Sequence, residues 1–414
     1  MKPRNLTFMT ALGLAILCLA ISRGSVAAPL PQQPTPGASS PAGPPAEDSL
    51  SKSGFDRFYN LDYERAIRDF EADLKAHPDD PFALNHLLTA RLFHQLYGMG
   101  VLDTGYYSNN SFIGQPHRKP DPKEQEQIKE LINRALKLED DRLEHDSKDV
   151  QTLYARGVTR GLRATYTALV ERSWFAALRS ALGARRDHQH VLELDPGYTD
   201  AKMVVGIHNY VVGSLPWGVK MAVAVVGIGG NKKKGIQYLY DVANCSTCQA
   251  STDAKVVLAL FLRREGRYPE ALEAIRSLAR SYPRNVLLAL EEPNILRAMG
   301  NNQEAEADYR KIFQEGREGR FNGHYELAAY GLGELLRGQK KYQAAADAFN
   351  LVDTVRQPDP EVQQRANLAA GEMYDLMEKR DLALKKYQTV IAEGSGSQPA
   401  DLARKHIKEA YRSN

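Results

Sequence analysis

The chain has 414 residues and a net charge of +3, with 43% hydrophobic and 25% charged residues. This is the composition of a globular protein with enough apolar material for a long core. The small net charge excludes a global electrostatic argument for nucleic acid, an anionic membrane or an acidic substrate, so we expect no nucleic-acid partner and a local basis for partner choice.

Residues 1–27 are predicted to be a signal peptide. Lys2 and Arg4 precede an apolar run over 8–21, and small residues at 25–27 come after it in the pattern that a signal peptidase recognises. The apolar run is too short to cross a bilayer comfortably. We therefore expect an exported protein, located in the periplasm or cell envelope.

Residues 28–50 are predicted to form a disordered linker. Their composition is dominated by Pro, Ala, Gly, Ser and Gln, which cannot bury a core and favours an extended, flexible chain. The linker is interpreted either as a spacer that holds the folded part away from a surface or as a tolerated unstructured end.

Residues 51–245 are predicted to be a divergent helical region with an inserted loop. Asp62 to Ala66, then Phe70 and a terminating Pro78, have the pattern of one helical unit. The loop over 98–120 interrupts the helical periodicity, and a segment of this length inside a compact array is often functional. Its aromatic residues are candidates for ligand contact, and the alternative is a plain surface insertion: Tyr106, Tyr107 and Phe112.

The segment after residue 211 contains an apolar run over 221–228, preceded by Leu215-Pro216-Trp217. A transmembrane span would need about twenty apolar residues, so a buried helix is favoured. The alternative is an interfacial anchor centred on Trp217, which would make the protein a membrane-associated assembly factor. The Gly and Lys cluster over 229–235 lacks the Gly-Lys-Ser/Thr ending of a phosphate-binding loop.

Cys245 and Cys248 are the two cysteines that remain after residue 27. In an oxidising compartment their spacing permits a structural disulfide, which is the favoured interpretation. A redox site would need the first cysteine at a helix N-terminus, where the thiol pKa falls, whereas Cys245 comes just after a predicted helix end. Zinc would need four ligands, and no second pair is visible. We predict no metal and no cofactor.

Residues 246–414 are predicted to form a repeat array. A set of four residues recurs 34 positions later with its order kept, and this period is typical of helical hairpins. The first set is Gly266, Ala271, Ile275 and Leu278, and the second is Gly300, Ala305, Tyr309 and Ile312. Ala345 with Phe349 and Ala383 with Tyr387 repeat the small-then-large spacing. One hairpin leaves apolar surface exposed, so the units must stack.

These residues resemble the tetratricopeptide repeat (TPR) family, whose second helix has the small, bulky and terminal proline order seen at Ala66, Phe70 and Pro78. The family's early tryptophan is missing, His188 stands where a bulky apolar residue is expected, and Pro293 stands at a helix glycine position. Residues 211–240 also resemble Iml2/TTC39-like TPR proteins, in which a Leu-Pro precedes an apolar helix.

The resemblance implies that the first helix of each hairpin lines a concave face that binds a protein or peptide partner. The residues implied to point into this face are Arg263, Arg297, Arg337, Asn294, Tyr330, Glu334 and Asp375. Arginines in a row can hold a carboxylate or an acidic peptide through bidentate bonds. The alternative is a solvated charged face.

The sequence therefore predicts an all-α, helical-hairpin repeat solenoid of the TPR-like superhelix type, ended by a capping helix over 399–412. We expect a binding scaffold that supports assembly in the cell envelope and is not an enzyme, because no catalytic constellation is found. The alternatives are a redox or other enzyme that uses Cys245 and Cys248 or the region 98–245, and a membrane-associated assembly factor.

Overall fold

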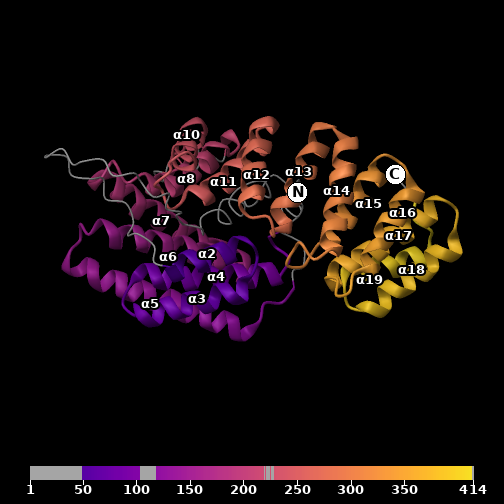
Figure 1. The fold of residues 1–414 in the computed structure, drawn as a ribbon, viewed down its shortest axis with the longest axis horizontal. Coiled ribbons are helices and arrows are strands. Elements are labelled where there is room, and N and C mark those ends of the chain that lie inside the picture. The colour runs from indigo at the N-terminus through magenta and orange to yellow at the C-terminus, as the bar shows by residue number, and fades with distance from the viewer. Residues whose placement is uncertain (1–48, 103–117, 219, 221–223, 225–227, 413–414) are drawn as a thin grey trace. The chain divides into compact units, whose positions relative to one another are not determined.

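The computed structural model describes residues 49–102, 118–218, 220, 224 and 228–412. In these residues every regular element is a helix, which confirms the all-α prediction (Figure 1). The chain divides into two compact units, one ending at Ala274 and the other beginning at Ile275. The division falls inside α12 (Tyr268–Ser281).

The N-terminal unit is a succession of antiparallel helices. Their bounds are α2 (Ser49–Tyr59), α3 (Tyr63–Ala76), α4 (Pro81–Gly98), α5 (Pro122–His145), α6 (Val150–Leu169), α7 (Trp174–Leu194), a short 3-10 helix (Thr199–Ala201), α8 (Lys202–Gly213), α10 (Lys232–Ala243) and α11 (Ser251–Arg264).

The C-terminal unit continues with three hairpins and a closing helix. They are α13 (Val286–Met299) with α14 (Asn302–Arg317), α15 (Glu326–Gly338) with α16 (Tyr342–Asn350), and α17 (Pro360–Leu376) with α18 (Arg380–Glu393), and the closing helix is α19 (Gln398–Lys408). A 3-10 turn (Leu351–Thr354) extends α16.

Aspartate placed directly before proline fixes where several helices begin. Asp80, Asp121 and Asp359 each precede a proline at the first helical position, and each carboxylate accepts a backbone N–H two residues on, at 3.0, 2.8 and 2.9 Å. Proline costs nothing there, because the first backbone N–H groups of a helix have no partner within the helix. The helix starts are thus encoded locally.

Three of the hairpins are closed by a glycine of the first helix packed against a large ring of the second. A Cβ atom at Gly371 would lie 2.6 Å from Cε1 of Tyr387, and Gly54 has the same relation to Phe70. Gly333 faces Phe349 in another hairpin. Side chains at these glycines would push the two helices apart, which explains the mid-helix glycines of the repeat pattern.

The two departures from the repeat pattern are accommodated inside the core. His188 takes the place of the bulky residue, is 1% exposed, and packs its ring edge-on against Tyr154. Its Nδ1 lies 2.9 Å from the carbonyl oxygen of Ala184, and burial lowers the pKa of the imidazole. Pro293 is buried within α13. Both residues are therefore part of the packed interior of the protein.

The last helix covers the end of the array. Ala403 of α19 belongs to one buried apolar cluster with Leu368 of α17 and with Ala383, Tyr387 and Val390 of α18. An uncovered final hairpin would expose this cluster to water, so α19 has the position of a capping helix. The sequence predicts this helix over 399–412, and the structure places it at Gln398–Lys408.

Candidate functional site

The candidate partner-binding residues of the C-terminal unit lie on its first helices, α13, α15 and α17. Tyr330, Glu334 and Arg337 are four and three residues apart, so they share one side of α15. The guanidinium of Arg365 on α17 lies 4.6 Å from the ring centroid of Tyr330, and a nitrogen of Arg337 lies 3.0 Å from an oxygen of Glu372. This side of α15 therefore faces α17.

The charges on this side of α15 are partly desolvated. Burial raises the pKa of Glu372 to about 7, although the charge of Arg337 opposes this shift. For Arg337 burial works against the charge, but Glu372 and Glu334 outweigh it and the pKa is raised. Burial also raises the pKa of the Tyr330 phenol. A half-buried arginine with two carboxylates can hold polar groups more strongly than an exposed one.

The chain's own end occupies the position next to Arg337. The hydroxyl oxygen of Tyr411 accepts a hydrogen bond from Arg337 at 2.8 Å, and the guanidinium carbon lies 5.6 Å from the ring centroid. The ring also meets that of His406 edge-on at 5.2 Å. Nothing in the repeat pattern points to Tyr411, because it lies beyond the last repeat.

Asp375, one of the predicted partner-binding residues, is bonded within the C-terminal unit. Its side chain is 0% exposed. Both of its oxygens accept bonds from Arg380 at 2.9 Å, and Oδ2 also accepts from the Tyr387 hydroxyl and the Tyr411 backbone N–H at 2.8 Å. The carboxylate thus joins α17, α18 and the chain end. The repeat phase places this residue on α17 correctly, but α18 and the chain end cover that side of the helix.

The remaining predicted residues differ in availability. The side chain of Asn294 accepts a hydrogen bond from the Tyr309 hydroxyl at 2.6 Å, which ties α13 to α14. Arg297 is exposed in the last turn of α13, the place that Arg337 takes on α15. Arg263 is half-buried at the end of α11, in the N-terminal unit.

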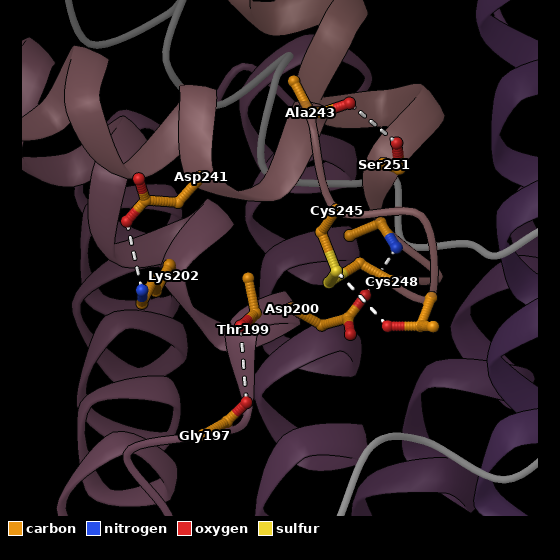
Figure 2. The surroundings of a disulfide bond; sticks show 11 residues. Gly197, Thr199, Asp200, Lys202, Asp241, Ala243, Cys245, Cys248 and Ser251 are labelled. Atoms are coloured by element: carbon orange, nitrogen blue, oxygen red, sulfur yellow. Dashed lines mark hydrogen bonds and ion pairs between the residues drawn. A yellow bond between two sulfur atoms is a disulfide. The ribbon is translucent and has the colours of Figure 1, made fainter. Parts of the chain in front are cut away.

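Cys245 and Cys248 are bonded to each other in the turn between α10 and α11, with their Cα atoms 5.3 Å apart (Figure 2). Cys248 is buried and Cys245 half-buried. The surrounding bonds fix the backbone: the Ala250 N–H donates to Asp200 at 2.6 Å and the Ser251 hydroxyl to the carbonyl of Ala243 at 3.0 Å. The arrangement is that of a staple between two helices.

The structure gives few contacts for the candidate residues of the loop over 98–120 and of the segment after residue 211. Tyr106, Tyr107 and Phe112 lie outside the described residues, as does most of the apolar run over 221–228. Trp217 is 79% exposed. Among the helices that the structure describes, none is long and apolar enough to cross a membrane. The described residues also contain no group of three or more His, Cys, Asp or Glu suited to a metal ion.

The architecture defines the class first: an all-α protein built from helical hairpin repeats. Residues 290–360, which run from α13 to the start of α17, match the family model described as tetratricopeptide repeat. This segment therefore resembles TPR repeats, and the resemblance seen in the sequence is confirmed for residues 290–360. TPR arrays are scaffolds that bind proteins rather than enzymes, which agrees with the expectation of a non-catalytic protein.

Comparison with curated proteins finds no match. Among solved structures the chain is similar to a TPR protein from Parabacteroides merdae, at 16% identity over 77% of this chain and 97% of that one, with a TM-score of 0.34. For PilF of Pseudomonas aeruginosa the identity is 16% over 60% of this chain and 99% of that one, with a TM-score of 0.34. For the human IFIT1 dimer with m7Gppp-AAAA the identity is 14% over 97% of this chain and 85% of that one, with a TM-score of 0.39. Likenesses at this level carry no conclusion about a partner.

Proposed function

We propose that this protein is an exported scaffold that binds an extended peptide or a protein partner along the first helices of its C-terminal repeats, in support of assembly in the cell envelope. The observation that carries the proposal is the pair Arg297 and Arg337. Both stand in the last turn of a first helix, and Arg337 already holds a carboxylate and a phenol hydroxyl.

Arg297 offers the same chemistry to solvent. It is exposed, whereas Arg337 is half-buried by the groups that it binds. Arginine donates through a planar fork of N–H groups and so recognises carboxylates and carbonyls on a partner with defined geometry. A partner that lies along α13 could therefore bind Arg297 without displacing another group of the protein from an exposed position.

Site-specific photocrosslinking in cells tests the binding face. A photoreactive amino acid is placed at Arg297, and in a matched variant at Lys311, which is exposed on the second helix α14. A discrete crosslinked partner from position 297 that is absent from 311 would support the proposal. Equal crosslinking from both positions would contradict it, because binding would then not depend on the first helices.

Export is tested separately. Residues 1–50 are fused to a reporter enzyme that is active only outside the cytoplasm, with Lys2 and Arg4 changed to glutamate in the control. Activity that depends on these two basic residues would support export, since a positive N-terminal region is part of the signal pattern. An inactive fusion that remains uncleaved would rule out the assignment of residues 1–27.

The exposed indole of Trp217 favours one second candidate, an association with a membrane surface. Flotation of the purified protein with liposomes of neutral and anionic lipid tests it. Flotation that is lost in Trp217→Ala would favour membrane association, whereas a protein that stays at the bottom of the gradient in both lipids removes this candidate.

A further inference from the structure

The end of the chain binds to the C-terminal unit in the manner of a short extended peptide. The helix α19 ends at Lys408, and Glu409 takes an extended conformation with φ −138° and ψ 119°. Two residues later the backbone N–H of Tyr411 donates to Asp375 at 2.8 Å, and its hydroxyl accepts from Arg337 at 2.8 Å. A backbone bond and a side-chain bond from one residue are the usual elements of peptide recognition.

We call the groups around this residue the Tyr411 pocket and define it by Arg337, Glu372, Asp375 and His406. The tyrosine ring lies beneath the Arg337 guanidinium, 5.6 Å from it, and meets the His406 ring edge-on at 5.2 Å. Cation–π and aromatic contacts of this kind favour an aromatic side chain over an aliphatic one. The phenol hydroxyl adds a hydrogen bond that phenylalanine cannot make.

The pocket is held in place by bonds that do not involve Tyr411. The Asp375 carboxylate is fixed by two bonds from Arg380 at 2.9 Å and one from the Tyr387 hydroxyl at 2.8 Å. Arg337 is held by Glu372 at 3.0 Å and by Glu334 at 3.6 Å. The acceptor for a backbone N–H and the donor for a hydroxyl therefore remain in place when the chain end leaves.

The capping helix has its own anchor upstream of Tyr411. Arg380 donates to the carbonyls of His406 and Ile407 at 2.7 Å and so caps the end of α19. Beyond Tyr411, Arg412 is exposed. Residues 409–412 can thus leave the pocket without unstacking α19 from the array.

We propose that the Tyr411 pocket is a peptide-binding site that the chain's own end occupies, and that its partner is an extended protein segment with a tyrosine that displaces Tyr411. The inference rests on the proposed function as a peptide-binding scaffold and adds to it the residue that the partner presents. An exchange of equivalent groups lets the partner replace each bond that the chain end gives up.

Fluorescence anisotropy with a labelled peptide of residues 407–412, Ile-Lys-Glu-Ala-Tyr-Arg, tests the proposal on the full chain. Tyr411→Ala empties the pocket, so it should bind the peptide at least about tenfold more tightly than the unaltered protein, in which the pocket is open about a tenth of the time or less. Tyr411→Phe, which keeps the ring and loses the hydroxyl, should lie between the two.

Two controls locate the binding. Arg412→Ala, a change next to Tyr411 at an exposed position, should bind the peptide as weakly as the unaltered protein does. A peptide with alanine in place of its tyrosine should fail to bind Tyr411→Ala, and so should the intact peptide when Arg337→Ala is added. Circular dichroism establishes that each variant is folded before binding is compared.

Equal peptide affinity in the unaltered protein and in Tyr411→Ala would overturn the proposal, as would binding that survives Arg337→Ala. This failure is distinct from that of the proposed function. Crosslinking from position 297 with no peptide binding would leave the scaffold and remove the Tyr411 pocket. Peptide binding without any crosslinked partner would keep the pocket and remove the envelope scaffold.

Discussion

Glu139 is predicted to make the N-terminal unit less stable as the pH rises. Its side chain on α5 is 0% exposed, one oxygen accepts from the Thr159 hydroxyl at 2.6 Å, and the other has no hydrogen-bond partner. Burial raises its pKa from 4.5 to about 8, although the bond from Thr159 opposes the shift. Glu139→Gln keeps the shape and an acceptor oxygen but cannot ionise, so it removes the titration alone.

The raised pKa of Glu139 decides whether the free energy of unfolding rises or falls with pH. Below about pH 4.5 the carboxyl is protonated in both states. Between about 4.5 and 8 the unfolded chain releases this proton and the folded chain retains it, so the free energy of unfolding falls as the pH rises. Above pH 8 both states are ionised and the loss is complete. At about 1.4 kcal/mol for each pH unit, the loss amounts to at most about 5 kcal/mol.

Urea unfolding of both proteins, monitored by circular dichroism at several pH values between 4.5 and 9, measures this effect. Subtracting the two free energies at each pH cancels every other titrating group. The difference in favour of Glu139→Gln should grow with pH and level off above about 8. Glu130→Gln, an exposed position on the same helix, should give a flat difference. A flat difference for Glu139→Gln as well would refute the buried, protonated carboxyl.

Three further predictions concern packing, the staple and the buried ion pair. Gly371→Ala should destabilise the C-terminal unit by about 1–3 kcal/mol, since a Cβ there would lie 2.6 Å from a ring whose hydroxyl is held by Asp375; Gly338→Ala, with open space around it, should be neutral in the same urea titration. Cys245→Ser should lower the free energy of unfolding by at most about 2 kcal/mol, because the loop that the disulfide closes is short. Melting temperatures measured with and without reductant check this prediction. Reductant should lower the melting temperature of the unaltered protein only, and an effect on the variant would contradict the role of the disulfide. Asp375→Ala should cost about 3 kcal/mol in urea unfolding, because it removes the buried acceptor shared by Arg380, the Tyr387 hydroxyl and the Tyr411 N–H, and an unchanged midpoint would contradict the internal role of this carboxylate.

The repeat architecture could be predicted because each hairpin repeats a local rule. A small residue at the helix crossing and a ring four positions later are visible at Ala345 with Phe349 and at Ala383 with Tyr387. The glycine that receives the ring precedes the small residue by twelve positions in both hairpins, Gly333 and Gly371. Such spacings are set by helix geometry, so they can be seen in one sequence without any knowledge of long-range contacts.

The candidate site could be predicted only in part, because phase along a helix does not say what covers that helix. The pattern places Arg297, Arg337 and Asp375 on first helices, and the structure agrees. It gives no sign that Arg380 and Tyr411 approach Asp375, since neither belongs to the matched positions of the repeat. In the same way Glu139 looks like an exposed residue of an acidic helix, and its burial depends on the neighbouring helix.

The end of the array explains why similar positions have different roles. An inner hairpin is covered by the next repeat on its apolar side, and for the hairpin α17 and α18 the helix α19 takes that place. The covering segment then uses the polar groups that the repeat supplies there: Asp375 accepts its backbone N–H and Arg337 binds its tyrosine. A partner segment with a tyrosine would compete with Tyr411 for Arg337. At Arg297 residues 409–412 would not compete with it.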